Sequence, residues 1–282
     1  MNTNIRLLIA ACEQLNMKFE ILHANHNLMR VFINEKPYYF TNFCTPFLSQ
    51  SISQIFKDKD YTYSLLKDKV SVPTTKAFLS PFCDEKYKTY LVYQDIDSIL
   101  EVIKQTLLMP IIVKRNSGSS GNNVFLCQTE EDIKLSLKQI FDVKSKDYDD
   151  VALAQEYIDI AHEYRAIIFK NELLLLYEKS KAEAKYVGNL SPLHWEGAKA
   201  IHITEKKLIS AIKNFIKPIY QDFSIDYGGF DIALDKNGKY WLIEINSHPN
   251  FDIFIRNNSE AIIVEMFKKM LQALISCPFK YL

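Results

Sequence analysis

The chain has 282 residues, which is long enough for two or three packed lobes around a sizeable core. Its 34 basic and 34 acidic residues balance to a formal net charge of zero, so charge gives no reason to expect nucleic acid or an anionic membrane as a partner. Five scattered cysteines without a C-x-x-C pair, and no apolar run near the roughly 18 residues of a membrane span, favour a soluble protein of the reducing cytoplasm.

The first part of the chain is expected to form a short N-terminal α/β lobe over residues 1–56. Apolar residues at helical spacing predict a helix over 5–16, and the apolar stretch before Cys12 is too short for a signal peptide. Strand-like runs separated by turn residues follow, at 19–24, 28–34 and 37–43. Two further helices are expected, at 51–56 and 61–69. The charged cluster between them contains Lys59 and, on local grounds alone, is typical of a solvated surface.

The next segment alternates strands and helices around a loop rich in glycine and serine. Strands are expected at 90–93, 111–114 and 124–127, and helices at 95–108 and from Thr129 onward, where a capping box begins. The loop follows Lys114 directly and contains Gly118 and Gly121. Small residues let backbone N–H groups close on phosphate oxygens, and the lysine supplies charge. The loop is neither a P-loop nor a G-x-G-x-x-G motif, and a flexible linker is the alternative.

The last part of the chain is expected to be strand-rich. Strands are predicted at 151–158, 163–170 and 172–179. Residues 180–200 have no clear periodicity and are interpreted as a long loop, a length at which loops are often active-site lids. Helices are expected from Thr204 to about residue 217 and from Ser259 to near the end of the sequence.

A β-hairpin over residues 227–246 carries the clearest candidate site. Asn237-Gly238 is typical of a two-residue type I′ turn, and the pairing that follows from such a turn sets Asp231 opposite Glu244. Asn246 falls on the same face, opposite Gly229, which leaves room there. Oxygen ligands of this kind suit Mg²⁺, which usually takes one or two carboxylates plus substrate phosphates. The alternative is a polar strand face turned to solvent.

Taken in order from about Ser51, these pieces resemble the ATP-grasp superfamily, and within it the cyanophycin synthetase, glutathione-type and D-alanine–D-alanine ligases. The resemblance implies an α+β fold in which two subdomains, 57–150 and 151–282, grip ATP after the N-terminal lobe. It implies an ATP- and Mg²⁺-dependent ligase that joins an amino acid or short peptide to an amine through an acyl-phosphate, with Mn²⁺ as an alternative metal. A phosphotransferase and a non-catalytic nucleotide-binding scaffold are the alternatives. The implied partners are small-molecule carboxylates and amines, with a homodimer left open.

The resemblance also implies roles for individual residues. Asp231, Glu244 and Asn246 match the metal set, and Asn246 also counts as catalytic. Arg165 and either Lys179 or Lys185 would face the γ-phosphate. Candidate substrate contacts are Lys185, His248, Asn250 and Arg256. The implied ATP-binding positions are Lys59, Lys114, Ser117, Gly118, Ser119, Ser120, Gly121, Gln155, Glu156, Tyr157, Ile158, Glu163 (for the ribose) and Ile243.

Two departures from the pattern stand out. Pro249-Asn250 replaces the usual Pro-Gly after the metal asparagine. Gly229 stands where D-alanine ligases carry an arginine that holds the tetrahedral intermediate, so another residue would have to stabilise that oxyanion, or the substrate differs.

Overall fold

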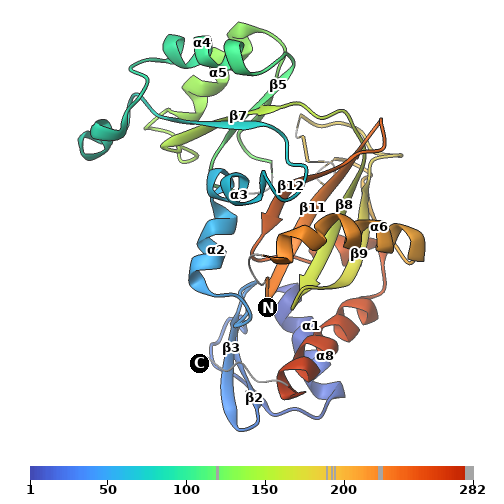
Figure 1. Ribbon diagram of the computed structural model, residues 1–282. Helices are drawn as coiled ribbons and strands as arrows, with labels where there is room; N and C mark the ends of the chain where they lie inside the picture. The colour runs from blue at the N-terminus through green and yellow to red at the C-terminus, as the bar shows by residue number, and fades with distance from the viewer. Residues whose placement is uncertain (119–120, 189, 192, 194, 222–224, 277–282) are drawn as a thin grey trace.

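The computed structural model describes residues 1–282 except 119–120, 189, 192, 194, 222–224 and 277–282. It contains three antiparallel sheets with helices packed on them, and this confirms the expected α+β class. In Figure 1 a four-stranded sheet lies at the top, a five-stranded sheet lies below it, and a three-stranded sheet lies at the bottom. None of the helices described is long and apolar enough to cross a membrane.

The N-terminal lobe consists of one helix and the three-stranded sheet. Its elements are α1 (Thr3–Gln14), β1 (Phe19–Ile21), β2 (Leu28–Ile33) and β3 (Lys36–Thr41). The sequence patterns predicted all four. Their buried residues share one core with Ile167, Phe169 and Leu175 of the five-stranded sheet and with the apolar stripe of α8 (Glu260–Ser276). The first and last helices of the described chain are therefore packed together, with α1 lying along α8 (Figure 1).

Two short helices connect this lobe to the four-stranded sheet, α2 (Gln50–Lys57) and α3 (Lys59–Leu66). The sheet has the order β4-β7-β5-β6, with β4 (Thr75–Leu79), β5 (Ile111–Arg115), β6 (Val124–Cys127) and β7 (Val151–Glu156). Helices α4 (Ile96–Thr106) and α5 (Glu130–Ile140) pack their apolar sides on it, and each starts with a capping box.

The strand expected at 90–93 is wrong. The described chain has a short 3₁₀ helix, η1 (Glu85–Tyr90), just before these residues and forms no strand there. Tyr90 and Val92 are 73% and 75% exposed, so their apolar side chains do not mark a core strand. The edge strand beside β7 is instead β4, which no pattern had predicted because its sequence, Thr-Lys-Ala-Phe-Leu, alternates only weakly.

The five-stranded sheet has the order β10-β9-β8-β11-β12. Its strands are β8 (Ile160–Phe169), β9 (Glu172–Ser180), β10 (Lys199–His202), β11 (Tyr227–Asp235) and β12 (Tyr240–Asn246). Helices α2 and α3, together with α6 (Lys206–Ile216), cover one face, and η3 (Lys217–Gln221) follows α6. The other face is apolar beside the N-terminal lobe and polar beside the four-stranded sheet. Two elements here were not predicted: β10 and the short helix α7 (Asp252–Asn257).

The β11–β12 hairpin forms as expected, but its turn differs from the prediction. Gly238 N–H donates to Asp235 O and Asp235 N–H donates to Lys239 O, so the loop has three residues and only Gly238 has a positive φ, +82°. This is a type I turn followed by a glycine bulge, and the type I′ prediction is wrong. A second bulge restores the predicted pairing further along: Ile232 pairs with Leu242 but Asp231 pairs with Glu244, which leaves Ile243 as the extra residue.

Candidate active site

A cavity of about 610 Å³ lies between the four-stranded and five-stranded sheets, a size typical of small-molecule sites. Residues of both sheets line it. Seventeen of the candidate positions are among the lining residues: Lys59, Lys114, Gly118, Gly121, Gln155, Glu156, Tyr157, Ile158, Glu163, Arg165, Lys179, Asp231, Ile243, Glu244, Asn246, His248 and Asn250.

One row of paired residues crosses the five-stranded sheet beneath the cavity. Tyr177 pairs with Arg165, Arg165 with Asp231, and Asp231 with Glu244. Residues paired directly across antiparallel strands share a face and lie close together. The strand order therefore brings a phenol, a guanidinium and two carboxylates to one line, although they are up to 79 positions apart in the sequence (244 − 165).

Asp231 is buried, at 3% exposure, and two cations compensate its charge. The Arg165 guanidinium donates to both carboxylate oxygens, through Nε to Oδ1 and through Nη2 to Oδ2 at 2.8 Å. Lys179 Nζ lies 2.8 Å from Oδ2 and also binds Glu163. Burial alone would raise the pKa of Asp231, but the charges of Arg165 and Lys179 outweigh burial and hold that pKa well below its ordinary value. Asp231 is thus an anion held by two cations.

Glu244 and Asn246 complete the candidate metal set beside Asp231. Asn246 Nδ2 lies 3.1 Å from Glu244 Oε1 and 3.4 Å from Asp231 Oδ2, so the three side chains converge. Two carboxylates and an amide fit Mg²⁺, which takes few protein ligands when phosphates supply the rest. No group of three or more His, Cys, Asp or Glu side chains suited to a metal occurs in the described part of the chain.

The absence of a side chain at Gly229 serves a different purpose from the one expected. It does lie opposite Asn246, but a Cβ there would be 3.1 Å from both Arg165 Cδ and Pro249 Cβ. The space that its missing side chain leaves is therefore taken by Arg165 and Pro249 and does not stay open for phosphates.

The opposite wall of the cavity carries two lysines. Lys114 on β5 is 6% exposed, and its Nζ donates to Gln155 Oε1 at 2.9 Å. Lys59, the first residue of α3, donates to Gly118 O at 2.9 Å and to Asn116 O at 3.3 Å. Burial lowers the pKa of both lysines, and together with the nearby charge of Lys59 it lowers that of Lys114 to about 8. Both lysine side chains donate their hydrogen bonds to neutral oxygens.

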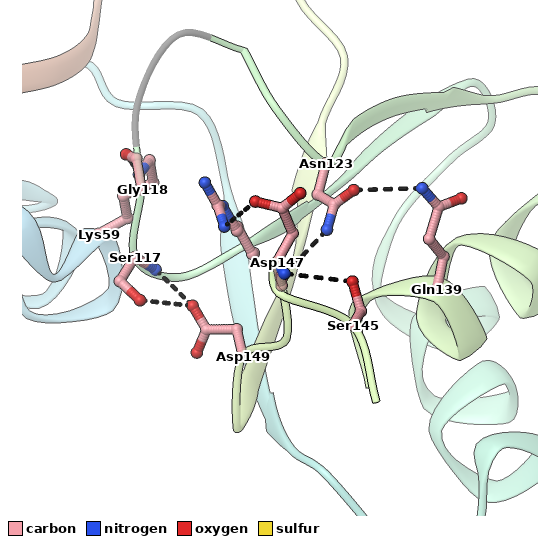
Figure 2. Close-up of polar contacts among 9 residues, drawn as sticks. Lys59, Ser117, Gly118, Asn123, Gln139, Ser145, Asp147 and Asp149 are labelled. Carbon is pink, nitrogen blue, oxygen red and sulfur yellow. Dashed lines mark hydrogen bonds and ion pairs between the residues drawn. The ribbon is translucent and has the colours of Figure 1, made fainter. Parts of the chain in front are cut away.

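The glycine- and serine-containing loop is anchored at its base (Figure 2). Ser117 donates to Asp149 Oδ2 from its backbone N–H at 2.7 Å and from its hydroxyl at 2.6 Å, and Asn123 donates to Asp147 O. Gly118 has φ +119°, and a Cβ there would collide with the Arg115 guanidinium. Ser117 thus fastens the loop and does not line the cavity, whereas Ser119 and Ser120 lie outside the described residues.

The last two residues of β7 and the two that follow it, 155–158, form the edge of the cavity between the two sheets, and we call them the edge segment. Gln155 bridges Lys114 and Thr75, donating to Thr75 Oγ1 at 2.8 Å. The Glu156 carboxylate accepts from Thr74 N–H at 3.1 Å, and Tyr157 and Ile158 follow on the lining. Glu163, the expected ribose ligand, lines the cavity but is bound to Lys179.

The remaining candidates divide into two groups. His248 lines the cavity with Nδ1 2.8 Å from Ser247 Oγ, and burial and the charge of Lys57 lower its pKa. Asn250 also lines it and donates to Asp252. Lys185 and Arg256 are exposed and are not among the lining residues, so the structure does not bring them to the site.

Several lining residues were not predicted from the sequence. Arg115 contacts Asp147 at 3.2 Å at the base of the loop, and its position next to Lys114 was the available signal. Tyr177 could have been found from strand alternation, because it lies two residues before Lys179. No sequence signal pointed to the others, which include Phe43, Leu193, Trp195 and Ile253.

Two sheets enclose a cavity with lysines on one wall and an acid–amide set on the other, the arrangement expected for an ATP-grasp domain. Residues 84–274 match the RimK-like ATP-grasp domain, and the chain belongs to this family.

Similar proteins agree with this assignment. A probable alpha-L-glutamate ligase of Vibrio atlanticus is 25% identical over 55% of this chain and 48% of its own length. D-alanine–D-alanine ligase B of Clostridium perfringens is 27% identical over 50% of this chain and 45% of its own. The chain therefore spans about half the length of these curated relatives.

Two solved structures share the fold. The VanG D-Ala:D-Ser ligase of Enterococcus faecalis superposes with a TM-score of 0.56 at 16% identity, over 79% of this chain and 61% of that one. The bifunctional glutathione synthetase of Pasteurella multocida gives 0.55 at 14% identity, over 95% of this chain and 44% of that one.

Proposed function

We propose that this protein is an ATP- and Mg²⁺-dependent carboxylate–amine ligase that acts on an amino acid or short peptide. The observation that carries the proposal is the pairing of Asp231 with Glu244, Arg165 and Lys179 on one wall of the cavity, opposite Lys59 and Lys114. The family and the ligase names of its relatives support it.

The two lysines would hold the phosphates of ATP. Lys59 and Lys114 lie near each other, and they donate to backbone carbonyls and a side-chain amide. Lys114 is buried and Lys59 is partly buried, and neither is hydrogen-bonded to a carboxylate, although the Glu244 charge is nearby; this favours an anionic ligand between them. The edge segment at Gln155 to Ile158 would take the base of the nucleotide, and Glu163 would take the ribose hydroxyls.

Asp231, Glu244 and Asn246 would hold Mg²⁺, with Mn²⁺ as an alternative. When bound, the cation neutralises negative charge on phosphate oxygens. It also competes with Arg165 and Lys179 for the Asp231 carboxylate. The cavity-facing Arg165 and Lys179 would then exchange part of their contact with Asp231 for the γ-phosphate and the substrate carboxylate.

The chemistry then needs little covalent help from the protein. A substrate carboxylate oxygen attacks the γ-phosphorus, the bond to the β–γ bridging oxygen breaks, and ADP and an acyl-phosphate result. The amine attacks the acyl carbon, phosphate leaves, and an amide forms. Arg165 and Lys179 stabilise charge as it moves. His248, whose pKa is lowered by burial and Lys57, is held largely neutral and can accept the proton of the amine.

The test is product analysis with ATP, Mg²⁺ and pooled amino acids and dipeptides. We expect ADP and free phosphate in equal amounts and an amide product by mass spectrometry. Glu244→Gln should remove all three, whereas Glu172→Gln, an exposed position at the far end of β9, should not. A phosphorylated product without free phosphate would instead identify a phosphotransferase, and nucleotide binding without any turnover would identify a scaffold.

A further inference from the structure

The charged side chains of the cavity are unevenly distributed. Six of the described lining residues are Lys or Arg. Five of them contact the glycine- and serine-containing loop and its base, the edge of the cavity around residues 155–160, or the carboxylates of Asp231 and Glu163. Lys59 and Arg115 attach to the loop and its base, Lys114 contacts Gln155, and Lys179 contacts Asp231 and Glu163. Lys181 donates to Ile160 O, just after the edge segment.

The sixth cation, Arg165, marks a boundary. Its guanidinium is held by Asp231, and its Cδ and the Pro249 Cβ both lie close to Gly229. Pro249 in turn belongs to the apolar part of the lining.

The part of the lining nearest the N-terminal lobe is apolar. We call it the apolar wall; it consists of Phe43, Tyr177, Leu193, Trp195, Pro249 and Ile253. These residues come from five separate segments: the β3–α2 connection, β9, the 180–200 segment, the stretch after β12, and α7.

Packing contacts and a hydrogen bond tie the apolar wall to the region beside the N-terminal lobe. Tyr177 belongs to the core shared with the N-terminal lobe, Leu193 packs against that core, and Tyr177 contacts Phe254, the neighbour of Ile253, with ring centroids 5.1 Å apart. The Pro249 carbonyl accepts from Asn4 of α1 at 2.9 Å. The N-terminal lobe thus helps to build this end of the cavity.

We propose that the substrate taken beyond the phosphates is an amino acid or short peptide with a neutral, apolar side chain. This inference rests on the proposed function. Covering the apolar wall with such a side chain removes apolar surface from water on both partners. An acidic side chain would lose its hydration there, and the cations beside Tyr177 of the wall, Arg165 and Lys179, are already paired with Asp231. Arg165 is adjacent but is needed for the reacting carboxylate.

The first test measures binding directly. With Mg²⁺ and a non-hydrolysable ATP analogue present, calorimetry compares leucine and phenylalanine with glutamate and lysine, each free and as a dipeptide with alanine. Burying one leucine or phenylalanine side chain predicts at least about tenfold tighter binding of the apolar compounds. Equal or tighter binding of the charged compounds, or no binding of the apolar ones, overturns the inference.

Phosphate release in parallel samples with ATP separates this inference from the proposed function. Selective binding of apolar compounds without turnover would contradict the ligase and leave the side-chain preference standing. Turnover with glutamate alone would do the reverse.

The second test changes the wall. Ile253 is partly exposed on α7, so Ile253→Lys adds a cation without filling a core position. We expect leucine affinity to fall about tenfold, glutamate affinity to rise by a similar factor, and affinity for the ATP analogue to stay the same. Arg256→Ala, on the same helix but away from the cavity, is the matched control and should change none of these.

Phe43→Ala guards against a folding defect in the helix variant, because Phe43 lies in a connection and is only partly buried. It should also weaken leucine binding about tenfold. Unchanged leucine affinity in both folded variants would overturn the assignment of the wall.

Discussion

The two walls of the cavity solve the problem of buried charge in opposite ways. On the five-stranded sheet, Asp231 is satisfied by Arg165 and Lys179 before any ligand arrives. On the opposite wall, Lys114 of the four-stranded sheet and Lys59 of α3 donate their hydrogen bonds to neutral oxygens, and burial lowers their pKa. The first wall is internally balanced and the second is left positive. A ligand with both phosphates and a divalent cation complements them together.

The largest effect should come from breaking the balanced wall. Asp231→Asn leaves Arg165 and Lys179 buried without their main anion, so we expect a loss of about 3–5 kcal/mol in the free energy of unfolding as well as loss of turnover. Urea denaturation followed by circular dichroism measures the first. Glu244→Gln removes a carboxylate that forms no salt bridge within the described part of the chain, and it should change the free energy of unfolding by less than about 1 kcal/mol. Similar losses in both variants would contradict the asymmetry within this wall.

The positive wall should respond differently. Lys114→Met removes a buried charge that has no acid partner, so stability should not fall, whereas ATP affinity should drop about 10- to 100-fold because a charged hydrogen bond to phosphate is lost. Calorimetry with ATP checks this, and Lys138→Met, at an exposed position on α5, is the matched control. A strongly destabilised Lys114→Met protein would show that the lysine is structurally compensated after all.

Raising the pH removes the positive charge of Lys114 without a substitution and should weaken ATP binding less than Lys114→Met does. Burial lowers the pKa of Lys114 to about 8, so the side chain is charged below that pH and loses its proton above it. ATP affinity should therefore fall roughly three- to tenfold between pH 7 and pH 9. The Lys114→Met variant should lose most of this dependence. An equal pH dependence in both proteins would assign the titration to another group.

The smallest effect should come from the hairpin loop, whose residues do not line the cavity and which reaches its rim through the contact of Lys236 with Asp159. Gly238 has φ +82°, so Gly238→Ala should cost about 1 kcal/mol in stability through backbone strain and leave ATP affinity unchanged. Lys236→Ala, in the same loop without a positive φ, should cost less than about 0.5 kcal/mol. Thermal melts of the two variants side by side would measure the difference, and a clear fall in ATP affinity for Gly238→Ala would link the loop to the site.

Sequence patterns predicted the elements whose signals are local. The capping box at Thr129, the three N-terminal strands and the strands β8 and β9 on either side of Asn171 all depend on residues within a few positions of one another. The pairing of Asp231 with Glu244 was also predicted, but from a two-residue turn that does not form; the three-residue loop shifts the register by one residue and the bulge at Ile243 shifts it back.

What could not be predicted depends on the order of strands in the sheets. Arg165 reaches Asp231 only because β8 lies beside β11, and Lys179 engages Glu163 only because β9 lies beside β8. Ser117 turns to Asp149 for a similar reason, since its partner lies 32 residues away. The apolar wall gathers five segments, and apart from the strand alternation at Tyr177 no sequence signal pointed to its membership in the cavity.

The bulge at Ile243 has a practical consequence for protein engineering. It separates the tip of the β11–β12 hairpin from the residues around Asp231, whose register is also held by β8 on the other side of β11. A change of length at the tip need not propagate past the bulge. Lys236 is tied to Asp159 of the cavity lining, whereas an added Cβ at Gly238 would have no neighbour within 4 Å. The Asn237-Gly238 end of the loop is therefore a suitable place to insert a fluorescent label or an affinity tag while Asp231 and Glu244 keep their alignment.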